Sequence, residues 1–408
     1  MVKNLIYLSA AGVILLLNMF PSFAGVTSTG LFEEAAREKA APETGQKGWI
    51  DKIDIEREKF AEKYGTTFAF LLNYQNLWAL RSSENERDNR GAWYYYLAVD
   101  QKLWRGASFV ATAEGGKGKG IDKILPTFSV YDGAAGEIAY LYVPELYLNQ
   151  NFFDGKFYIN AGRTDLSNWF DANEVANISD TQFLSSALVN NPLIPFPQKG
   201  LAAMAGIKPE DWLCLQTGVS NAKGSSTQIG LRSAFEDKPA WFFMNEACLC
   251  PKIWGLQGNY RFALRRNFQD LDRIDGSGIQ HDDWGFSLSF DQQVTQKVTL
   301  FCRYGFADKR VRDLSDFWSA GGQITGLVPG RKEDIFGMAV AQSFLGDDYR
   351  SANGPGLASR ETMFETYYSI ELNRILTLIP TLQFVANPDG EANAKNEIVG
   401  GARLVLIF

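Results

Sequence analysis

The chain has 408 residues, a formal net charge of −7 and 46% hydrophobic residues, of which many are aromatic. A mildly acidic chain argues against nucleic acid as a partner, because phosphate backbones are bound by basic surfaces. One histidine and four cysteines without a Cys-x-x-Cys pair give little basis for a metal site, so we expect neither a metal nor another cofactor.

Residues 1–24 have the layout of a secretory signal peptide. Lys3 is followed by an apolar run from Leu5 to Leu17 and by a cleavage-site pattern with small residues at Ser22 and Ala24, in Ser22-Phe23-Ala24. The run is short for a membrane helix, which needs about 20 residues. We expect cleavage after Ala24, and a retained N-terminal anchor is the less favoured alternative.

Residues 25–65 differ from the rest of the chain because they are rich in Glu, Lys and Ala. The stretch "DKIDIEREKFAEKYG" predicts a short helix with Asp51 near its start and Gly65 just past its end. Its apolar stripe is thin. We therefore expect a helical or extended leader, loosely docked on the main body rather than inserted into it as a plug.

Apolar and polar side chains alternate along many segments between residues 66 and 408. In "TTFAFLLNYQNLW", Leu72 and Tyr74 share one face while Asn73 and Gln75 share the other. The same period occurs in "YLYVPELYLNQ", "WGLQGNYRFALRR" and "KVTLFCRYGF". Repetition of such segments, each of roughly ten residues, is typical of an outer-membrane β-barrel.

The last segment, "NEIVGGARLVLIF", ends on Phe408 with no polar residue after it. One face is wholly apolar, whereas the other carries Glu397 and Arg403. We expect this strand to pair with the first one, which leaves no open edge. Phe408 would then lie at the periplasmic interface, where aromatic girdles occur, and offer a contact for the barrel-assembly machinery.

The connections between these segments differ in length. Short ones fall near 105, 154, 210, 250, 295 and 373, and long polar ones cover 81–91, 114–135, 165–198, 267–283, 346–360 and 388–396. Short periplasmic turns should alternate strictly with long external loops. A first count that includes "TQIGLRSAF" (227–235) gives seventeen strands, an odd number that single-chain bacterial barrels avoid. With 221–239 taken as one loop, residues 66–408 form an all-β, antiparallel transmembrane barrel of sixteen strands.

Sixteen strands enclose an aqueous channel. Its selectivity then depends on what narrows it. The longest loop, 165–198, contains Trp169, Phe170, Phe183 and Phe196, which is unusually apolar for an external loop. Long loops are commonly functional. We expect this loop to fold into the lumen, and a surface loop packed on its neighbours is the alternative.

The C-terminal stretch "ETMFETYYSIELNRILTLIPTLQFVANPDG" resembles the carbohydrate-selective porins of the OprB type. The matching positions are Glu365, Tyr368, Pro380, Gln383, Asn387, Pro388 and Gly390. "FYINAGRTDLSNWF", "PFPQKGLAAMAGIKP" and "GVSNA" are similar to the family as well. The resemblance implies a sixteen-strand barrel in the outer membrane of a Gram-negative-type bacterium that passes sugars by diffusion.

A sugar-selective wall needs aromatic faces for the rings and charged groups for the hydroxyls. The candidates for such contacts are Arg163, Asp165, Trp169, Phe170, Glu246, Arg261, Arg303 and Glu365. Simple alternation points Arg163 toward lipid, so it needs a bulge or the end of its strand to turn inward.

Three other functions compete with a sugar-selective porin: a porin of another kind, an enzyme and a purely structural barrel. A non-selective porin, or a porin for other small solutes, needs charge but no aromatic ledge. An enzyme is disfavoured because His281 is isolated in an external loop and no GxSxG motif occurs. A purely structural barrel would not need so many polar lumen positions. The sequence leaves open whether the barrel forms a homotrimer and whether Cys214 and Cys248 form a disulfide.

Overall fold

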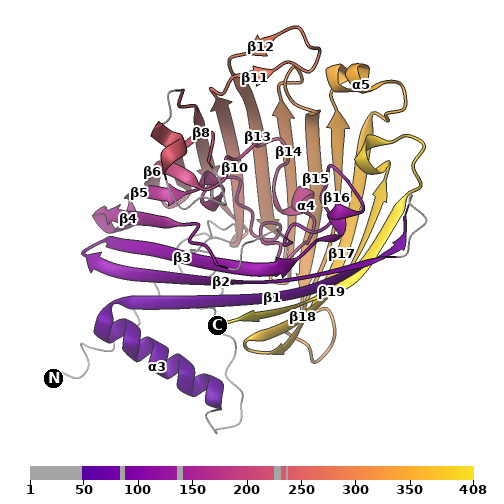
Figure 1. The fold of residues 1–408 in the computed structure, drawn as a ribbon. Helices are drawn as coiled ribbons and strands as arrows, with labels where there is room; N and C mark the ends of the chain where they lie inside the picture. Colours follow the sequence, from indigo (N-terminus) through magenta and orange to yellow (C-terminus); the bar gives the residue numbers. More distant parts are fainter. Residues whose placement is uncertain (1–47, 83–87, 136–140, 225–230, 236–237) are drawn as a thin grey trace, which may run out of the picture.

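The computed structural model describes residues 48–82, 88–135, 141–224, 231–235 and 238–408. The predicted signal peptide, its cleavage site and the first part of the leader lie outside these ranges. The main body is one antiparallel sheet that closes on itself (Figure 1). The sheet has seventeen strands, of which β9 (Lys252–Ile253) is only a two-residue pairing on β10. Sixteen strands thus close the barrel, as predicted.

Those sixteen strands are β1 Thr66–Arg81, β2 Asn89–Trp104, β3 Ala107–Gly118, β4 Leu146–Phe152, β5 Phe157–Thr164, β6 Gly200–Glu210, β7 Leu213–Asn221, β8 Trp241–Leu249, β10 Leu256–Asn267, β13 Asp283–Gln293, β14 Val298–Ala307, β15 Leu314–Thr325, β16 Ile335–Leu345, β17 Arg360–Asn373, β18 Leu376–Ala386 and β19 Glu397–Ile407. The other described elements are α3 Trp49–Tyr64, α4 Ser186–Val189, α5 Asp347–Asn353, the hairpin of β11 Leu271–Asp272 and β12 Ile279–Gln280, and several 3-10 turns.

The seam between β1 and β19 closes the cylinder. The two strands pair antiparallel from Leu71 opposite Ile407 onward. Beyond that pair, Phe70 and Phe408 exchange two backbone hydrogen bonds of 2.9 Å. The C-terminal segment is therefore the partner of the first strand, as its alternation predicts.

The two faces of the wall divide as the sequence predicts. On β1, Asn73 and Gln75 point inward and are at most 1% exposed, whereas Tyr74 and Trp78 are 50% and 44% exposed on the outside. On β19, Arg403 is fully buried on the inner side while Leu404 is exposed. Strand side chains alternate between faces, so one wall serves both lipid and lumen.

The two ends of the barrel carry different connections. α3 and the shorter turns lie at one end, and α5 and the β11–β12 hairpin lie at the other (Figure 1). After Asn221, the last residue of β7, the described residues up to 239 contain the 3-10 turn Arg232–Phe235 and no strand, which supports the prediction of a loop. Residues 227–230 of the rejected strand lie outside the described residues. The prediction that short turns at one end alternate strictly with long loops at the other was wrong. The turn 326–334 is longer than the loop 308–313 at the opposite end.

The predicted helix before the barrel is α3, and Gly65 follows it with a left-handed φ of 69°. Phe60 packs on Phe68 of β1 at 5.5 Å between ring centroids. Asp54 pairs with Arg374 of the β17–β18 turn at 2.8 Å. The helix is thus docked beside the start of β1. None of the described helices is both long and apolar enough to cross a membrane.

Candidate functional site

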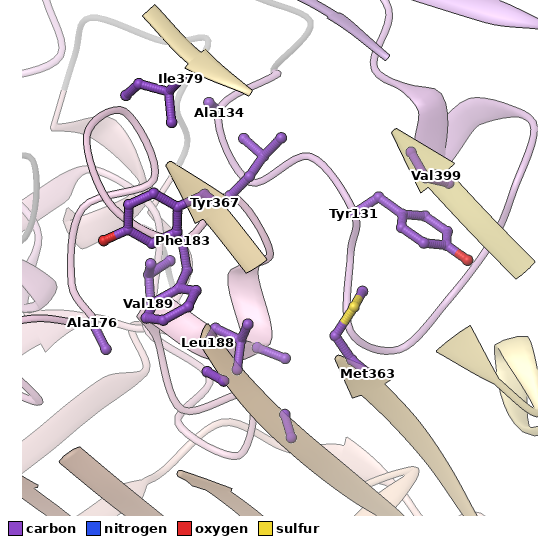
Figure 2. Packing of buried hydrophobic residues seen from close by; sticks show 14 of the residues in the cluster. Tyr131, Ala134, Ala176, Phe183, Leu188, Val189, Met363, Tyr367, Ile379 and Val399 are labelled. Carbon is purple, nitrogen blue, oxygen red and sulfur yellow. The ribbon is translucent and has the colours of Figure 1, made fainter. Parts of the chain in front are cut away.

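The segment between β5 and β6, residues 165–199, lies inside the barrel and is called the pore loop below. Its Phe183 ring lies 5.8 Å from Phe301 of β14 and 5.0 Å from Tyr367 of β17. Leu188 and Val189 belong to the same buried cluster (Figure 2). An apolar loop that packs on inward-facing wall residues is removed from water, which accounts for its composition.

Two wall arginines hold the backbone of the pore loop. Arg303 of β14 donates to the carbonyl oxygens of Asp171, Ala176 and Leu188 at 2.9, 2.5 and 2.9 Å. Arg403 of β19 donates to the carbonyls of Ser179 and Gln182. A guanidinium presents several donors in a fixed plane, so each side chain can serve more than one carbonyl.

Two wall glutamates hold the same loop through its amides. Glu365 of β17 accepts from the backbone N–H groups of Leu184 and Ser185 at 2.6 and 2.8 Å. Glu246 of β8 accepts from the N–H of Asp171 at 3.1 Å. Hydrogen bonds to ionised groups are among the stronger ones in proteins. The loop is therefore fixed from several sides of the barrel.

A second inward segment, formed by residues 119–135 and 141–145 between β3 and β4, supports the pore loop. Glu361 of β17 accepts from the N–H groups of Phe128 and Ser129 at 3.1 and 2.8 Å. Tyr131 donates its hydroxyl to Glu397 of β19 at 2.6 Å. The N–H of Gly133 donates to the carbonyl of Leu184 at 2.9 Å, which joins the two segments.

A lysine cluster lies at the two ends of the pore loop. Lys199 pairs with Asp165 at 2.8 Å and with Glu145 at 3.0 Å. Burial alone would lower the pKa of Lys199, but the two carboxylates outweigh that effect and raise this pKa, so the ammonium stays charged. The Lys199 and Asp165 side chains are 19% and 13% exposed, which leaves them within reach of water.

The predicted charged residues other than Arg163 fall into three places. Glu246, Arg261 and Arg303 lie near the start of the pore loop: Arg303 and Glu246 both bind Asp171, and Arg261 pairs with Asp291 at 3.2 Å. Glu365 anchors the middle of the pore loop, and Asp165 belongs to the lysine cluster. The sequence thus identified charged lumen residues but not their division into separate groups.

The two predicted aromatic residues are closed to solvent. Trp169 and Phe170 are 6% and 1% exposed, and Trp169 packs edge-on against Tyr147 at 5.6 Å. They share an apolar cluster with Phe242 and Met244 of β8. Neither ring offers a free face to a sugar, so both rings pack the base of the loop against the wall.

Arg163 is not brought into the lumen group. It stands opposite Leu146 on β4 and Leu201 on β6, and the register has no shift there. The bulge that would turn its side chain inward is therefore missing. Its side chain is 3% exposed, so it is closed to solvent although its strand position faces outward by alternation.

Several residues that fix the loops were not singled out in the sequence: Glu145, Asp171, Asp180, Lys199, Glu361 and Arg403. The inward position of Glu361 and Arg403 was available from alternation. The contacts of Asp171 and Asp180 depend on the path of the loop. Across the described ranges, no group of three or more His, Cys, Asp or Glu side chains is arranged to hold a metal ion.

Asp132 of the second inward segment makes the docking of this segment pH-dependent. Burial, reinforced by the carboxylate of Asp122, raises its pKa to about 7. Because the folded pKa exceeds the unfolded value of about 3.9, this group adds stability that is complete below about pH 4 and lost as pH rises through 7. We expect a higher melting temperature at pH 5 than at pH 8.

The control for this prediction is Asp132→Asn, which keeps the shape and removes the titration. Its melting temperature should change less between pH 5 and pH 8 than that of the unaltered protein. An equal change in both proteins would assign the pH dependence to other groups. Circular dichroism in detergent measures it.

Known proteins share this architecture. The family profile described as "Carbohydrate-selective porin, OprB family" matches residues 106–408. The chain is 22% identical over 312 residues to Porin B of Pseudomonas aeruginosa. This alignment covers 65% of this chain and 67% of that protein. It is 23% identical over 255 residues to Porin AaxA of Chlamydia trachomatis, and there it spans only about half of the relative's length.

Solved structures agree on the fold. The high-pH structure of Pseudomonas putida OprB superposes with a TM-score of 0.78 at 19% identity, covering 90% of this chain and 100% of that one. The outer-membrane channel DcaP of Acinetobacter baumannii gives a TM-score of 0.55 at 9% identity over 84% of this chain and 97% of that one. At these identities the likeness concerns the barrel itself.

Proposed function

Because the chain belongs to the OprB family of carbohydrate-selective porins, we propose that it lets small carbohydrates diffuse across the outer membrane. The observation that carries this proposal is the pore loop, fixed inside a closed sixteen-strand barrel by buried charged side chains. A loop held from several sides narrows the channel permanently, so solutes are sorted by fit rather than by opening and closing.

We assign the selection of sugars to the lysine cluster, which consists of Lys199, Asp165 and Glu145. The side chains of Lys199 and Asp165 are 19% and 13% exposed, whereas Arg261, Arg303 and Arg403 are at most 2% exposed and hold the loop. A solute that passes the loop can meet the first pair but not the buried arginines. Charged groups form strong hydrogen bonds with hydroxyls, which favours sugars over apolar solutes of equal size.

Liposome swelling tests the solute class. With glucose, larger sugars and amino acids of matched size, we expect faster entry of the sugar in each matched pair. The reason is that hydroxyls of a sugar can replace water at the lysine cluster. Equal rates at equal size would instead identify a non-selective porin, and faster amino-acid entry a porin for other solutes.

Sugar block of the ion current tests the lysine cluster itself. Lys199→Met should weaken block by glucose, since the ammonium donor is lost, while Lys199→Arg should restore much of it. The matched control is Lys309→Met: Lys309 also faces an aspartate, Asp347 at 3.5 Å, but lies in an exposed external loop. Unchanged block in Lys199→Met, with the barrel intact, would remove Lys199 from the sugar path.

We infer no enzymatic step. The family and the fold are those of a channel. His281 is 81% exposed and pairs with Asp270 at 2.8 Å in an external loop. Diffusion through a channel requires no catalytic group.

We also propose a homotrimer, with copies joined through the outer face of β4 to β8. β4 and β5 have seven and eight residues, fewer than the roughly nine to eleven that a membrane-crossing strand needs. Thr217 donates to Asn245 at 2.8 Å on this outer face, within a depression of about 770 Å³. Polar side chains on a lipid face are costly, so protein is the better cover.

Native mass spectrometry in mild detergent tests the assembly. A three-chain mass is expected, because three is the smallest closed ring built from one head-to-tail interface. Asn245→Trp should give single chains, whereas Leu382→Trp on β18, also outward-facing and exposed, should not. A one-chain mass for the unaltered protein would contradict the proposal.

A further inference from the structure

Three of the four cysteines meet inside one end of the barrel. Cys214 of β7 lies directly opposite Cys248 of β8 in the strand register. Cys250 follows β8, and its Sγ lies 3.2 Å from the Sγ of Cys248. All three side chains are buried and form their own cluster with Tyr158, whereas Cys302 lies exposed on β14. None of the four is disulfide-bonded in this structure.

We propose that these three cysteines form a thiol–disulfide exchange site in which Cys248 is the shared sulfur. Cys248 bonds to Cys250 in one oxidised form and to Cys214 in the other. The first pair already has its sulfur atoms close together. The second pair is directly cross-strand, where Cα atoms are about 4.5–5.5 Å apart, within the range of about 4.4–6.8 Å that disulfides adopt.

The burial and grouping of the thiols fit three simpler roles poorly: apolar packing, metal binding and bracing of the fold. Scattered buried cysteines would behave as small apolar side chains, with no reason to gather around one sulfur. A metal site is not supported, since no suitable group of ligands occurs among the described residues. A Cys248–Cys250 bond closes a very short loop, so it adds little chain-entropy stabilisation. Exchange of the bond, rather than bracing of the fold, is the use that this geometry offers.

The oxidant in this reaction is a disulfide-containing donor molecule in the compartment to which the protein is exported. The Cys250 thiol, which is the most exposed of the three, loses a proton, and its thiolate attacks a donor sulfur to give a mixed disulfide and one donor thiolate. The Cys248 thiol then loses a proton, and its thiolate attacks the Cys250 sulfur and releases the second donor thiolate. Two electrons and two protons pass to the donor, which ends as two thiols. Attack of Cys214 on Cys248 afterwards moves the bond without further oxidant.

Disulfide mapping of the exported, full-length protein tests the site. Unfolding in iodoacetamide without reductant, followed by mass spectrometry, should find one Cys248–Cys250 disulfide, with Cys214 and Cys302 alkylated. Cys250→Ser should shift the bond to Cys214–Cys248, because Cys214 is the remaining neighbour. Cys302→Ser and Cys214→Ser should keep the Cys248–Cys250 bond. Heat-dependent mobility on gels checks that each variant retains a folded barrel.

Four alkylated cysteines in the unaltered protein after incubation with oxidised glutathione would overturn the proposal. So would a disulfide that includes Cys302. A folded Cys250→Ser variant without any disulfide would also overturn it, since Cys248 would then not be shared.

Discussion

Replacing Arg303 with methionine is expected to release the pore loop and to raise single-channel conductance. Arg303 binds three loop carbonyls and pairs with Asp171 at 3.4 Å, and both charged side chains are buried. Removal of one partner of a buried ion pair costs about 3–5 kcal/mol, because the other charge is left without compensation. Strand pairing stabilises the wall independently of Arg303, so the lost free energy destabilises mainly the position of the pore loop.

Planar-bilayer recording measures the conductance, and swelling with larger oligosaccharides measures the widened passage. The matched control is Arg266→Met on β10, where the arginine pairs with Asp282 at 2.7 Å but is 56% exposed. Exposed pairs contribute little, about 0–1 kcal/mol, so this variant should conduct like the unaltered protein. Unchanged conductance in a folded Arg303→Met barrel would show that the loop does not set the passage.

The wall of the barrel could be predicted from the sequence because its signal is local. A side chain such as Gln75 or Arg403 faces inward by its place in a two-residue period, whatever lies across the lumen. Closure was expected because β19 has an apolar outer face and because an unpaired strand edge is costly in lipid. The strand count needed a further rule, an even number, to decide against a strand at 227–235.

The roles of the lumen residues could not be predicted in the same way. Alternation places Glu365 and Arg303 inside, but only the path of the pore loop decides that they bind backbone groups rather than solute. Trp169 and Phe170 were expected to face sugars, yet hydrophobic burial favours packing them on Phe242 and Tyr147. For Arg163, the strand register contains no bulge that would turn the side chain inward.

The residues that carried the family resemblance take part in fixing the loops. Gln383 of β18 donates to Glu365 at 2.9 Å and to the carbonyl of Tyr131 at 2.8 Å. It thus connects the anchor of the pore loop to the second inward segment. Asn387 turns the chain after β18 with a left-handed φ of 54°. These two residues of the family pattern therefore help to place the loops, a role that the sequence pattern alone does not reveal.

Deletion of Phe408 is expected to reduce strongly the amount of folded barrel in the outer membrane. The residue supplies both backbone hydrogen bonds that pair it with Phe70 at the seam. Its ring also lies 5.8 Å from the guanidinium of Arg57 on α3, which is within cation–π range. Deletion would remove the last pairing of β19 with β1 and lengthen the unpaired edge at the start of β1, which is costly in lipid.

Phe408→Ala separates the seam from the ring, because it keeps the backbone bonds and removes only the aromatic group. If the barrel-assembly machinery binds the ring, this variant should also be depleted in the membrane while its thermal stability in detergent stays close to normal. If only the seam bonds matter, Phe408→Ala should accumulate normally. Phe152→Ala is the matched control, since Phe152 is an exposed aromatic residue at the same end of the barrel. Normal membrane amounts of the Phe408 deletion, measured by heat-dependent gel mobility, would refute the expectation that closure depends on this residue.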